Sequence, residues 1–218
     1  MKIILFSRKS IALRTEDIEI IFGAIERYGF DFAVNEEAAH SIEQFIGRTI
    51  TPEQRYGSSI GSVDSEAVMV CYGGDGTLLE GVHRLCGKKI PVVGINSGRL
   101  GFLALAQSSE IDEVFEQIAT RTLRIEQRSM LEVTGEFEGR QQSVYALNEV
   151  AVQRLGATMI SVDVMVDAMP TLTCNGDGVI IGQGQVVFPT GDLYFTEQGD
   201  HRFLIGIVAD LHTAVNGT

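Results

Sequence analysis

The chain has 218 residues, 44% of them hydrophobic, which is enough to build a core for one large domain or two small ones. The formal net charge of −12 argues against a nucleic-acid backbone as partner, because neutralising phosphates requires clustered Lys and Arg. The three cysteines lack disulfide-framework or zinc spacing, and no apolar run suits a signal peptide or a membrane span, so we expect a cytoplasmic protein without a membrane partner.

The first half of the sequence alternates continuous apolar runs with amphipathic segments. In chain order, the predicted elements are a strand over 2–6, helices over 15–28 and 36–47, a mobile loop over 49–65, a strand over 67–72, a helix over 78–86, a strand over 90–95 and a helix over 109–120. Continuous apolar strands are typical of parallel sheets that are covered on both faces. The strands over 67–72 and 90–95 both run into polar, glycine-bearing turns, which is how open α/β sheets form ligand crevices.

From about residue 123 the pattern changes to alternation of apolar and polar residues, which favours antiparallel strands. We expect strands over 129–137, 142–153 and 160–166, the first two joined by a turn at Glu138-Gly139. The sequence therefore predicts an α/β domain over 1–121 and a β-rich domain over 122–218.

A glycine loop with the sequence GGDGT, at 73–77, lies between a predicted strand and a predicted helix. Glycines let the backbone approach a phosphate closely and turn successive N–H groups toward it, and the helix adds its positive end. The plain alternative is a tight strand-to-helix turn, which has no use for a carboxylate among its glycines. The loop lacks the Gly-Lys-Ser/Thr ending of a Walker A loop and the glycine spacing of the dinucleotide fingerprint.

Asp75 is the candidate general base of this loop. A carboxylate beside bound phosphates repels them unless it performs chemistry or holds a metal ion. In phosphoryl transfer to a hydroxyl, a positioned carboxylate accepts or orients the hydroxyl proton. Alignment and charge stabilisation supply the rest of the rate acceleration, and they require a divalent cation and N–H donors. The loop therefore predicts a phosphoryl-transfer enzyme.

Three motifs together resemble the successive signatures of the NAD kinase family. They are GGDGTLL at 73–79, NSGRLGFL at 96–103 and ALNEV at 146–150, and the likeness extends over about residues 1–181, including RSML at 128–131 and NGDG at 175–178. The resemblance implies an N-terminal Rossmann-like parallel α/β domain followed by a β-rich domain. It also implies ATP-dependent phosphorylation of the adenosine 2′-hydroxyl of NAD, giving NADP, with Mg²⁺ or a similar ion and a homodimer or homotetramer.

The resemblance also assigns roles to individual residues. Asp75 would be the catalytic carboxylate, and the phosphate and nucleotide sites would include Gly73, Gly74, Gly76, Thr77 and Asn96. Asn148 and Glu149 would hydrogen-bond the adenosine, Phe102 would wall the adenine pocket and Asp177 would reach the nicotinamide side.

Physical reasoning on the same residues leaves several readings open. Asn148 and Glu149 lie in an otherwise apolar strand predicted over 145–152, so they either find buried hydrogen-bond partners or face solvent. Phe102 by itself would be a core residue. Asp177 by itself would be a turn residue.

Two rival functions remain open at this stage. A lipid kinase of the diacylglycerol or sphingosine type shares a glycine-aspartate loop, but those relatives lack the turn at 96–103. A catalytically weak or silent nucleotide-binding protein is favoured by the region after residue 181. There the family pattern has a Thr-Pro-Thr-Gly-Ser-Thr-Ala-Tyr stretch and a further β-rich run, whereas PTG at 189–191 is the only echo here and the sequence ends at Thr218. From these differences we expect an incomplete β-rich domain, weak NAD binding and slow or absent turnover.

Overall fold

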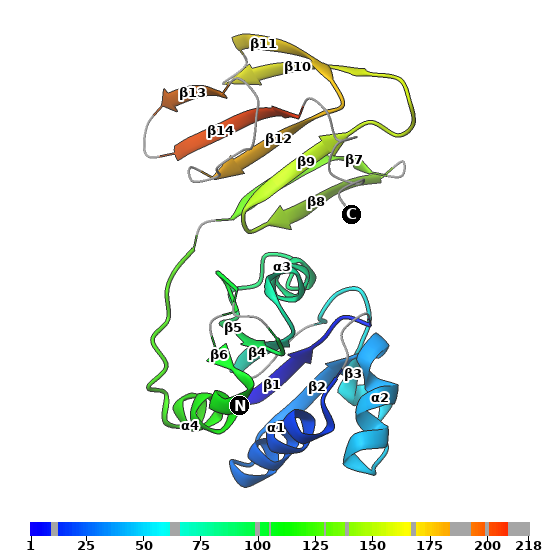
Figure 1. The fold of residues 1–218 in the computed structure, drawn as a ribbon, viewed down its shortest axis with the longest axis vertical. Helices are drawn as coiled ribbons and strands as arrows, with labels where there is room; N and C mark the ends of the chain where they lie inside the picture. Colours follow the sequence, from blue (N-terminus) through cyan, green and yellow to red (C-terminus); the bar gives the residue numbers. More distant parts are fainter. Residues whose placement is uncertain are drawn as a thin grey trace. The chain divides into compact units, whose positions relative to one another are not determined.

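In the computed structural model, the apolar strands of the first half pair in parallel and the strands of the second half pair antiparallel (Figure 1). The structure describes residues 1–9, 13–61, 66–98, 101–104, 106–128, 130–137, 140–166, 169–183, 193–198 and 201–208. They form two units, Met1–Arg128 and Ser129–Thr218. The domain boundary expected after residue 121 stays a prediction. No helix in these described ranges combines the length and the hydrophobicity that crossing a membrane requires.

The N-terminal unit is a six-stranded sheet with strand order β3-β2-β1-β4-β5-β6. The strands are β1 (Lys2–Phe6), β2 (Asp31–Asn35), β3 (Arg55–Tyr56), β4 (Ala67–Tyr72), β5 (Val92–Asn96) and β6 (Ala106–Gln107). The helices are α1 (Thr15–Arg27), α2 (Glu36–Ile46), α3 (Asp75–Arg84) and α4 (Ile111–Thr120), with short 3₁₀ helices η1 (Pro52–Gln54) and η2 (Ser108–Glu110). The chain leaves β1 toward β2 on one side and returns to β4 on the other, so β1 and β4 flank a topological switch point.

The helices of this unit cover the two faces of the sheet unequally. Figure 1 shows α1, α2 and α4 on one face and α3 on the other. The alternation of strand side chains explains this arrangement. Ile3, Leu5 and Val70 join the core cluster under α1, α2 and α4, whereas α3 at Gly81 lies over the side chains of Phe6 and Cys71. Strands covered on both faces are continuously apolar, as the sequence indicated.

Two expectations for this unit are wrong in detail. The segment 49–65 is not a loop throughout, because η1 and β3 lie within it and the buried Tyr56 hydroxyl donates to the Leu5 carbonyl at 3.0 Å. Residues 62–65 lie outside the described part. The helix expected to begin at Leu78 begins at Asp75, because the glycine loop supplies its first turn.

The second unit consists of antiparallel strands in three sheets: β7 with β8, β10 with β11, and a four-stranded sheet of order β13-β14-β12-β9. The strands are β7 (Leu131–Phe137), β8 (Arg140–Ala146), β9 (Glu149–Gln153), β10 (Ile160–Val166), β11 (Met169–Gly176), β12 (Gly178–Gln183), β13 (Leu193–Gln198) and β14 (His201–Val208). Strands β13 and β14 come from the stretch after residue 182 that departs from the family pattern. The PTG sequence at 189–191, Ser129 and the turn at Glu138-Gly139 lie outside the described residues.

The strand predicted over 142–153 is a further correction. The chain bends at Leu147–Asn148, and the two halves enter different sheets as β8 and β9. Apolar runs lie on both sides of the bend, at 144–147 and 150–152, which is why the sequence pattern alone concealed it.

Candidate functional site

The glycine loop is formed where β4 ends and α3 begins. Gly73 has φ of +152°, and its N–H donates to the Ile95 carbonyl of β5 at 2.9 Å. A Cβ at Gly73 would lie 2.3 Å from Thr77 Oγ1, so only glycine fits here. Gly74 is the N-cap of α3, and its carbonyl accepts hydrogen bonds from the N–H groups of Thr77 and Leu78. The loop is therefore a tight turn that presents the start of a helix.

Asp75 occupies the first turn of α3, and its carboxylate is held by the second polar turn of the sheet. Oδ2 accepts the N–H of Phe102 at 2.8 Å, while Oδ1 accepts the N–H groups of Leu103 at 3.0 Å and Ala104 at 2.9 Å. A carboxylate oxygen has two lone pairs, so Oδ1 is saturated by these bonds and Oδ2 retains one acceptor position. Asp75 thus has both a structural contact and an oxygen that remains available for a proton.

The close approach of the two turns depends on Gly101. A Cβ at this position would lie 2.2 Å from Asp75 Oδ1 and 2.6 Å from Asp75 Cγ. Sequence reasoning singled out both turns but missed that they are joined through one carboxylate. The signal was the glycine at 101 itself, since a backbone that must approach another group closely is where glycine is required.

The environment of Asp75 keeps it ionised. Burial raises the pKa of its carboxyl, but the hydrogen bonds from the N–H groups of Ala104, Phe102 and Leu103 together outweigh burial, and the pKa lies below its ordinary value. The carboxylate is therefore charged throughout the neutral range. It loses its charge only as the pH falls through its pKa, which is lower than the pKa of an ordinary aspartic acid.

The remaining predicted residues of the N-terminal unit differ in exposure. Thr77 and Asn96 are buried, and Asn96 Oδ1 accepts the Gly98 N–H at 2.9 Å, so both shape the turns. Gly76 lies in α3 beside the guanidinium of Arg8. Phe102 is 92% exposed, so the expectation that it is a core residue is wrong. The backbone N–H of Phe102 turns toward Asp75, and its ring is exposed and available to a ligand.

A buried polar network behind the loop was not predicted from the sequence. The Asp17 carboxylate, in the first turn of α1, accepts the Tyr72 hydroxyl at 2.5 Å and the Ser108 hydroxyl at 2.7 Å. Tyr72 directly precedes Gly73 and is fully buried. Burial and the hydrogen bond to Asp17 raise the pKa of its hydroxyl, which therefore stays protonated as a donor. The network ties the start of α1 to the end of β4 and to Ser108, which directly follows β6.

In the second unit, Asn148 and Glu149 lie at the start of β9. Asn148 is half-buried at the bend between the two sheets, and Glu149 is exposed. The continuous strand expected around the pair is wrong, and the roles of the two side chains stay predictions. Both side chains stand at a strand end, where functional groups of β-rich domains are accessible to ligands.

Asp177 lies at the other end of the strand pair formed by β9 and β12. The register pairs Glu149 with Gly182 and Gln153 with Gly178, so four residue steps, or about 13 Å, separate the two ends. Asp177 Oδ1 is 2.5 Å from Arg154 Nε, and the Asp177 carbonyl accepts the Arg154 N–H at 2.9 Å. Sequence reasoning missed Arg154, because nothing in its local pattern indicates this contact.

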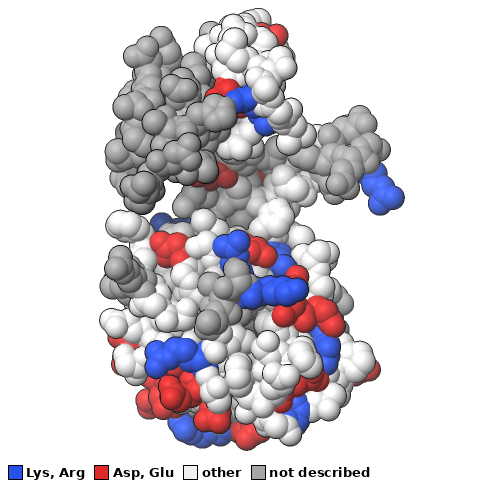
Figure 2. Space-filling view, turned by 45° about the vertical axis from the view of Figure 1, so that its right-hand side comes forward, with Lys and Arg blue, Asp and Glu red and all other residues white. Residues whose placement is uncertain are grey.

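Charged residues on the N-terminal unit are largely paired. Figure 2 shows acidic and basic side chains interspersed over its visible face. Arg27 pairs with Asp112 at 3.0 Å and Arg55 with Glu43 at 2.6 Å. In the described ranges, no group of at least three His, Cys, Asp or Glu side chains is placed to hold a metal ion. A magnesium ion bound to a nucleotide takes most of its ligands from phosphates and water, so one carboxylate such as Asp75 suffices for it.

Known proteins match the chain along both units. Residues 26–123 match the family model described as the ATP-NAD kinase N-terminal domain. An NAD kinase of Bacteroides fragilis is 29% identical over 197 residues, which cover 90% of this chain and 65% of that protein. An NAD kinase of Sulfurimonas denitrificans is 28% identical, over 82% of this chain and 63% of the relative.

The family model, which covers less than half of the chain, and the curated relatives support membership of the NAD kinase family. The chain spans slightly less than two thirds of the length of these two relatives. The fold of family members is similar: a yeast NADH kinase complexed with NADH superposes with a TM-score of 0.65 at 21% identity, covering 83% of this chain and 57% of the other. An NAD kinase from Archaeoglobus fulgidus in complex with ATP superposes with a TM-score of 0.59 at 21% identity, covering 97% of this chain and 74% of the other. The predicted order of an α/β domain followed by a β-rich domain is confirmed.

Proposed function

We propose that this chain carries out ATP-dependent phosphorylation of the adenosine 2′-hydroxyl of NAD, giving NADP. The observation that carries the proposal is the Asp75 carboxylate, which lies in the first turn of α3, is held by three backbone N–H groups and keeps one oxygen position open. The family matches supply the substrates, because the relatives are NAD kinases and one solved structure contains ATP. A cytoplasmic location and a homodimer or homotetramer belong to the same proposal.

The chemical step follows from the acceptor position on Asp75. The 2′-oxygen of NAD forms a bond to the γ-phosphorus of ATP, and the bond from that phosphorus to the β,γ-bridging oxygen breaks. ADP leaves, and the hydroxyl proton passes to Asp75 Oδ2. Backbone N–H groups of the glycine loop and the positive end of α3 favour the charge on the transferred group. A magnesium ion, when bound with the nucleotide, would neutralise part of the phosphate charge.

The two units take different parts in this proposal. The N-terminal unit contributes the glycine loop and Asp75, and the exposed ring of Phe102 offers a wall for adenine. The second unit contributes Asn148 and Glu149 for the adenosine and Asp177 for the nicotinamide side. The separation of about 13 Å along β9 and β12 suits a ligand with recognition groups at both of its ends, as a dinucleotide has.

Asp75→Asn tests the assignment of the base. We expect kcat for NADP formation to fall by roughly 10²-fold or more, the loss typical of a general base. The amide also replaces one acceptor by a donor that faces N–H groups, so some weakening of the turn at 101–104 accompanies it. The matched control is Asp112→Asn, the same change at an exposed carboxylate on α4.

Two measurements accompany this pair of variants, a steady-state assay of NADP formation and a calorimetric titration with NAD. The control should keep the kcat of the unmodified chain, and Asp75→Asn should keep most of its NAD affinity. Near-normal kcat in Asp75→Asn would show that Asp75 is not the base. Heat from NAD without any turnover in the unmodified chain would favour the silent nucleotide-binding protein.

A further inference from the structure

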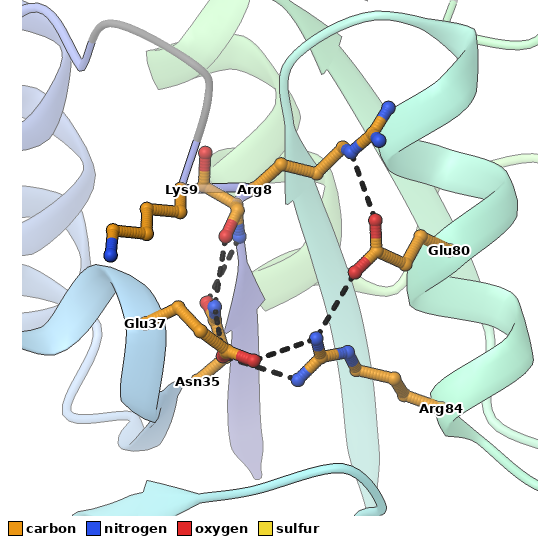
Figure 3. Close-up of a pocket in the computed structure, with 7 residues that line it drawn as sticks. Arg8, Lys9, Asn35, Glu37, Glu80 and Arg84 are labelled. Atoms are coloured by element: carbon orange, nitrogen blue, oxygen red, sulfur yellow. Dashed lines mark hydrogen bonds and ion pairs between the residues drawn. The ribbon is translucent and has the colours of Figure 1, made fainter.

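A cavity of about 310 Å³ opens at the carboxyl ends of β1 and β2, one strand away from the glycine loop (Figure 3). Its walls come from the residues after β1, the junction of β2 with α2, and one side of α3. The residues that matter here are Arg8, Asn35, Glu37, Glu80 and Arg84. Carboxyl ends of parallel strands beside a topological switch point are where open α/β sheets bind ligands.

Arg8 reaches from this cavity to the glycine loop. Its Nε lies 2.9 Å from Glu80 Oε2, and its Nη1 lies 3.1 Å from the position that a Cβ would take at Gly76. The guanidinium therefore lies against the backbone of the loop. Glu80 engages the Nε edge, and within the described part of the chain the terminal nitrogens have no hydrogen-bond or ion-pair partner. Arginine has five N–H donors, so several remain for an anion.

The glycine loop itself provides no side-chain cation for a phosphoryl group. The loop at 73–77 contains no Lys or Arg, and Asp75 adds negative charge to it. A phosphoryl group in transfer carries charge on three oxygens, and stabilising that charge is the main task of such sites. The planar guanidinium of arginine matches phosphate oxygens better than a point charge does.

We propose that Arg8 is a further catalytic residue, whose guanidinium contacts the phosphoryl group transferred at the glycine loop. The inference rests on the proposed function and adds to it the cation that the loop lacks. The cavity beside Arg8 gives the phosphate chain of the donor nucleotide room to enter.

The backbone that leads to Arg8 is fixed by a buried amide. Asn35, which is fully buried, accepts the Ser7 N–H at 3.0 Å and donates to the Ser7 carbonyl at 2.8 Å. The Ser7 hydroxyl donates to the Tyr72 carbonyl at 2.8 Å, which ties this turn to the last residue of β4. Arg8 therefore begins from a defined backbone position next to the loop.

The side chain of Arg8 is fixed by alternating charges, which Figure 3 shows as one chain of contacts. Glu80 bridges Arg8 and Arg84, with 3.0 Å to Arg84 Nη2. Arg84 in turn pairs with Glu37 at 2.9 Å, and Glu37 accepts from Asn35 at 3.0 Å. The Arg84 guanidinium beside Glu37 lowers the pKa of that carboxyl to about 2, so Glu37 stays charged at neutral pH. Glu80 is a positioning residue on this reading.

The rival explanation is that Arg8 and Glu80 form an ordinary surface ion pair. Such pairs contribute little to stability, and the Arg8 side chain is 46% exposed. An ordinary pair predicts that removing Arg8 has little effect on any property of the full chain. The catalytic role predicts a loss confined to steps that involve the donor phosphates.

Arg8→Ala in the full chain distinguishes the two readings. With NAD and MgATP we expect kcat to fall by roughly 10²-fold or more, with NAD affinity unchanged. Added guanidinium ion, at concentrations that leave the chain folded, should restore part of the lost rate, which no structural role would produce. Arg27→Ala, which removes an exposed arginine paired with Asp112, is the matched control and should keep the original rate.

Glu80→Gln tests the positioning role separately. The neutral side chain still accepts a hydrogen bond but holds the guanidinium less firmly, so we expect a smaller fall in kcat, about tenfold or less, and no rescue by guanidinium. Unchanged kcat in Arg8→Ala, or a loss that guanidinium does not restore together with a lowered melting temperature, would overturn the assignment of Arg8.

A titration with MgATP in the absence of NAD separates this inference from the proposed function. Losing charged hydrogen bonds to phosphates should raise the Kd of Arg8→Ala for MgATP by about tenfold. If the unmodified chain forms no NADP, the proposed function fails, and this titration still decides whether Arg8 meets the donor phosphates. An unchanged Kd in that case would overturn the inference as well.

Discussion

The two units of the chain bury their apolar side chains to different extents. In the N-terminal unit, strand residues such as Ile3, Leu5 and Val70 are at most 1% exposed, and helices cover both faces of the sheet. In the described part of the second unit, the hydrophobic cluster has Cys174 and Val179 as its buried members. The helices that connect parallel strands pack on the faces of the sheet. Antiparallel strands can be joined by short turns, so one face of their sheet stays exposed unless another layer packs on it.

Exposed apolar side chains show the same difference. Most of the large exposed hydrophobic residues described in the chain belong to the second unit: Val152, Leu155, Met159, Met165 and Met169. The N-terminal unit exposes Ile20, Phe102 and Ile125 in the same class, and Phe102 lies at the candidate site. In a unit whose core is closed, the exposed aromatic ring of Phe102 needs another explanation than incomplete packing, and its role at the adenine site stays a prediction.

The largest expected effect on stability is in the core of the N-terminal unit. Leu5→Ala removes a side chain that is 1% exposed, and we expect the free energy of unfolding to fall by about 2–5 kcal/mol. Urea denaturation of the full chain measures the loss, and hydrogen exchange should localise it to β1 and β4. A loss below about 1 kcal/mol would show that this core is not closed around Leu5.

A ligand-dependent effect is expected at the start of β9. Glu149→Gln should weaken NAD binding by about 1.5–3 kcal/mol while leaving ATP binding nearly unchanged, because it removes a charged acceptor for a ribose hydroxyl. Calorimetric titrations with each nucleotide measure the two affinities. Glu132→Gln, on β7, is the matched control, since its side chain can still accept the Tyr145 hydroxyl. Equal losses for both nucleotides would indicate a folding defect instead.

The smallest effect is expected on the open surface of the second unit. Met165 is 64% exposed, next to a register shift in β10, so Met165→Ala should change the free energy of unfolding by less than about 0.5 kcal/mol. Urea denaturation beside Leu5→Ala gives the contrast between the units directly. A loss comparable to that of Leu5→Ala would mean that Met165 is covered in solution and that the comparison is wrong.

Much of the N-terminal fold was predictable because its strands are continuous apolar runs. The strands over 2–6 and 67–72 are confirmed at both ends. Burial on both faces makes such a strand a continuous apolar run, which can be recognised without knowing its neighbouring strands. The start of α3 was misplaced, because glycines conceal a helix whose first turn they form. The short strand β3 was missed, because two residues are too few to show a period.

The contacts of the candidate site were less predictable than its residues. The sequence indicated Asp75 and the turn at 96–103, but the hydrogen bonds between them join groups 27–29 positions apart. The same holds for Asp17 with Tyr72 and for Arg8 with Glu80. Local patterns report which face of an element is buried, and they do not report which polar groups meet across the fold.

Phosphoryl transfer to NAD by the full chain is the most direct test of the account. The chain is incubated with NAD and ATP labelled at the γ-phosphate, NADP is detected by its oxidoreductase reaction, and a calorimetric titration with NAD alone is run in parallel. We expect slow incorporation of label into NADP by the unmodified chain, as the divergence after residue 181 indicates, and none above background from Asp75→Asn. Heat from NAD binding with no labelled NADP from the unmodified chain, at any MgATP concentration, would contradict it.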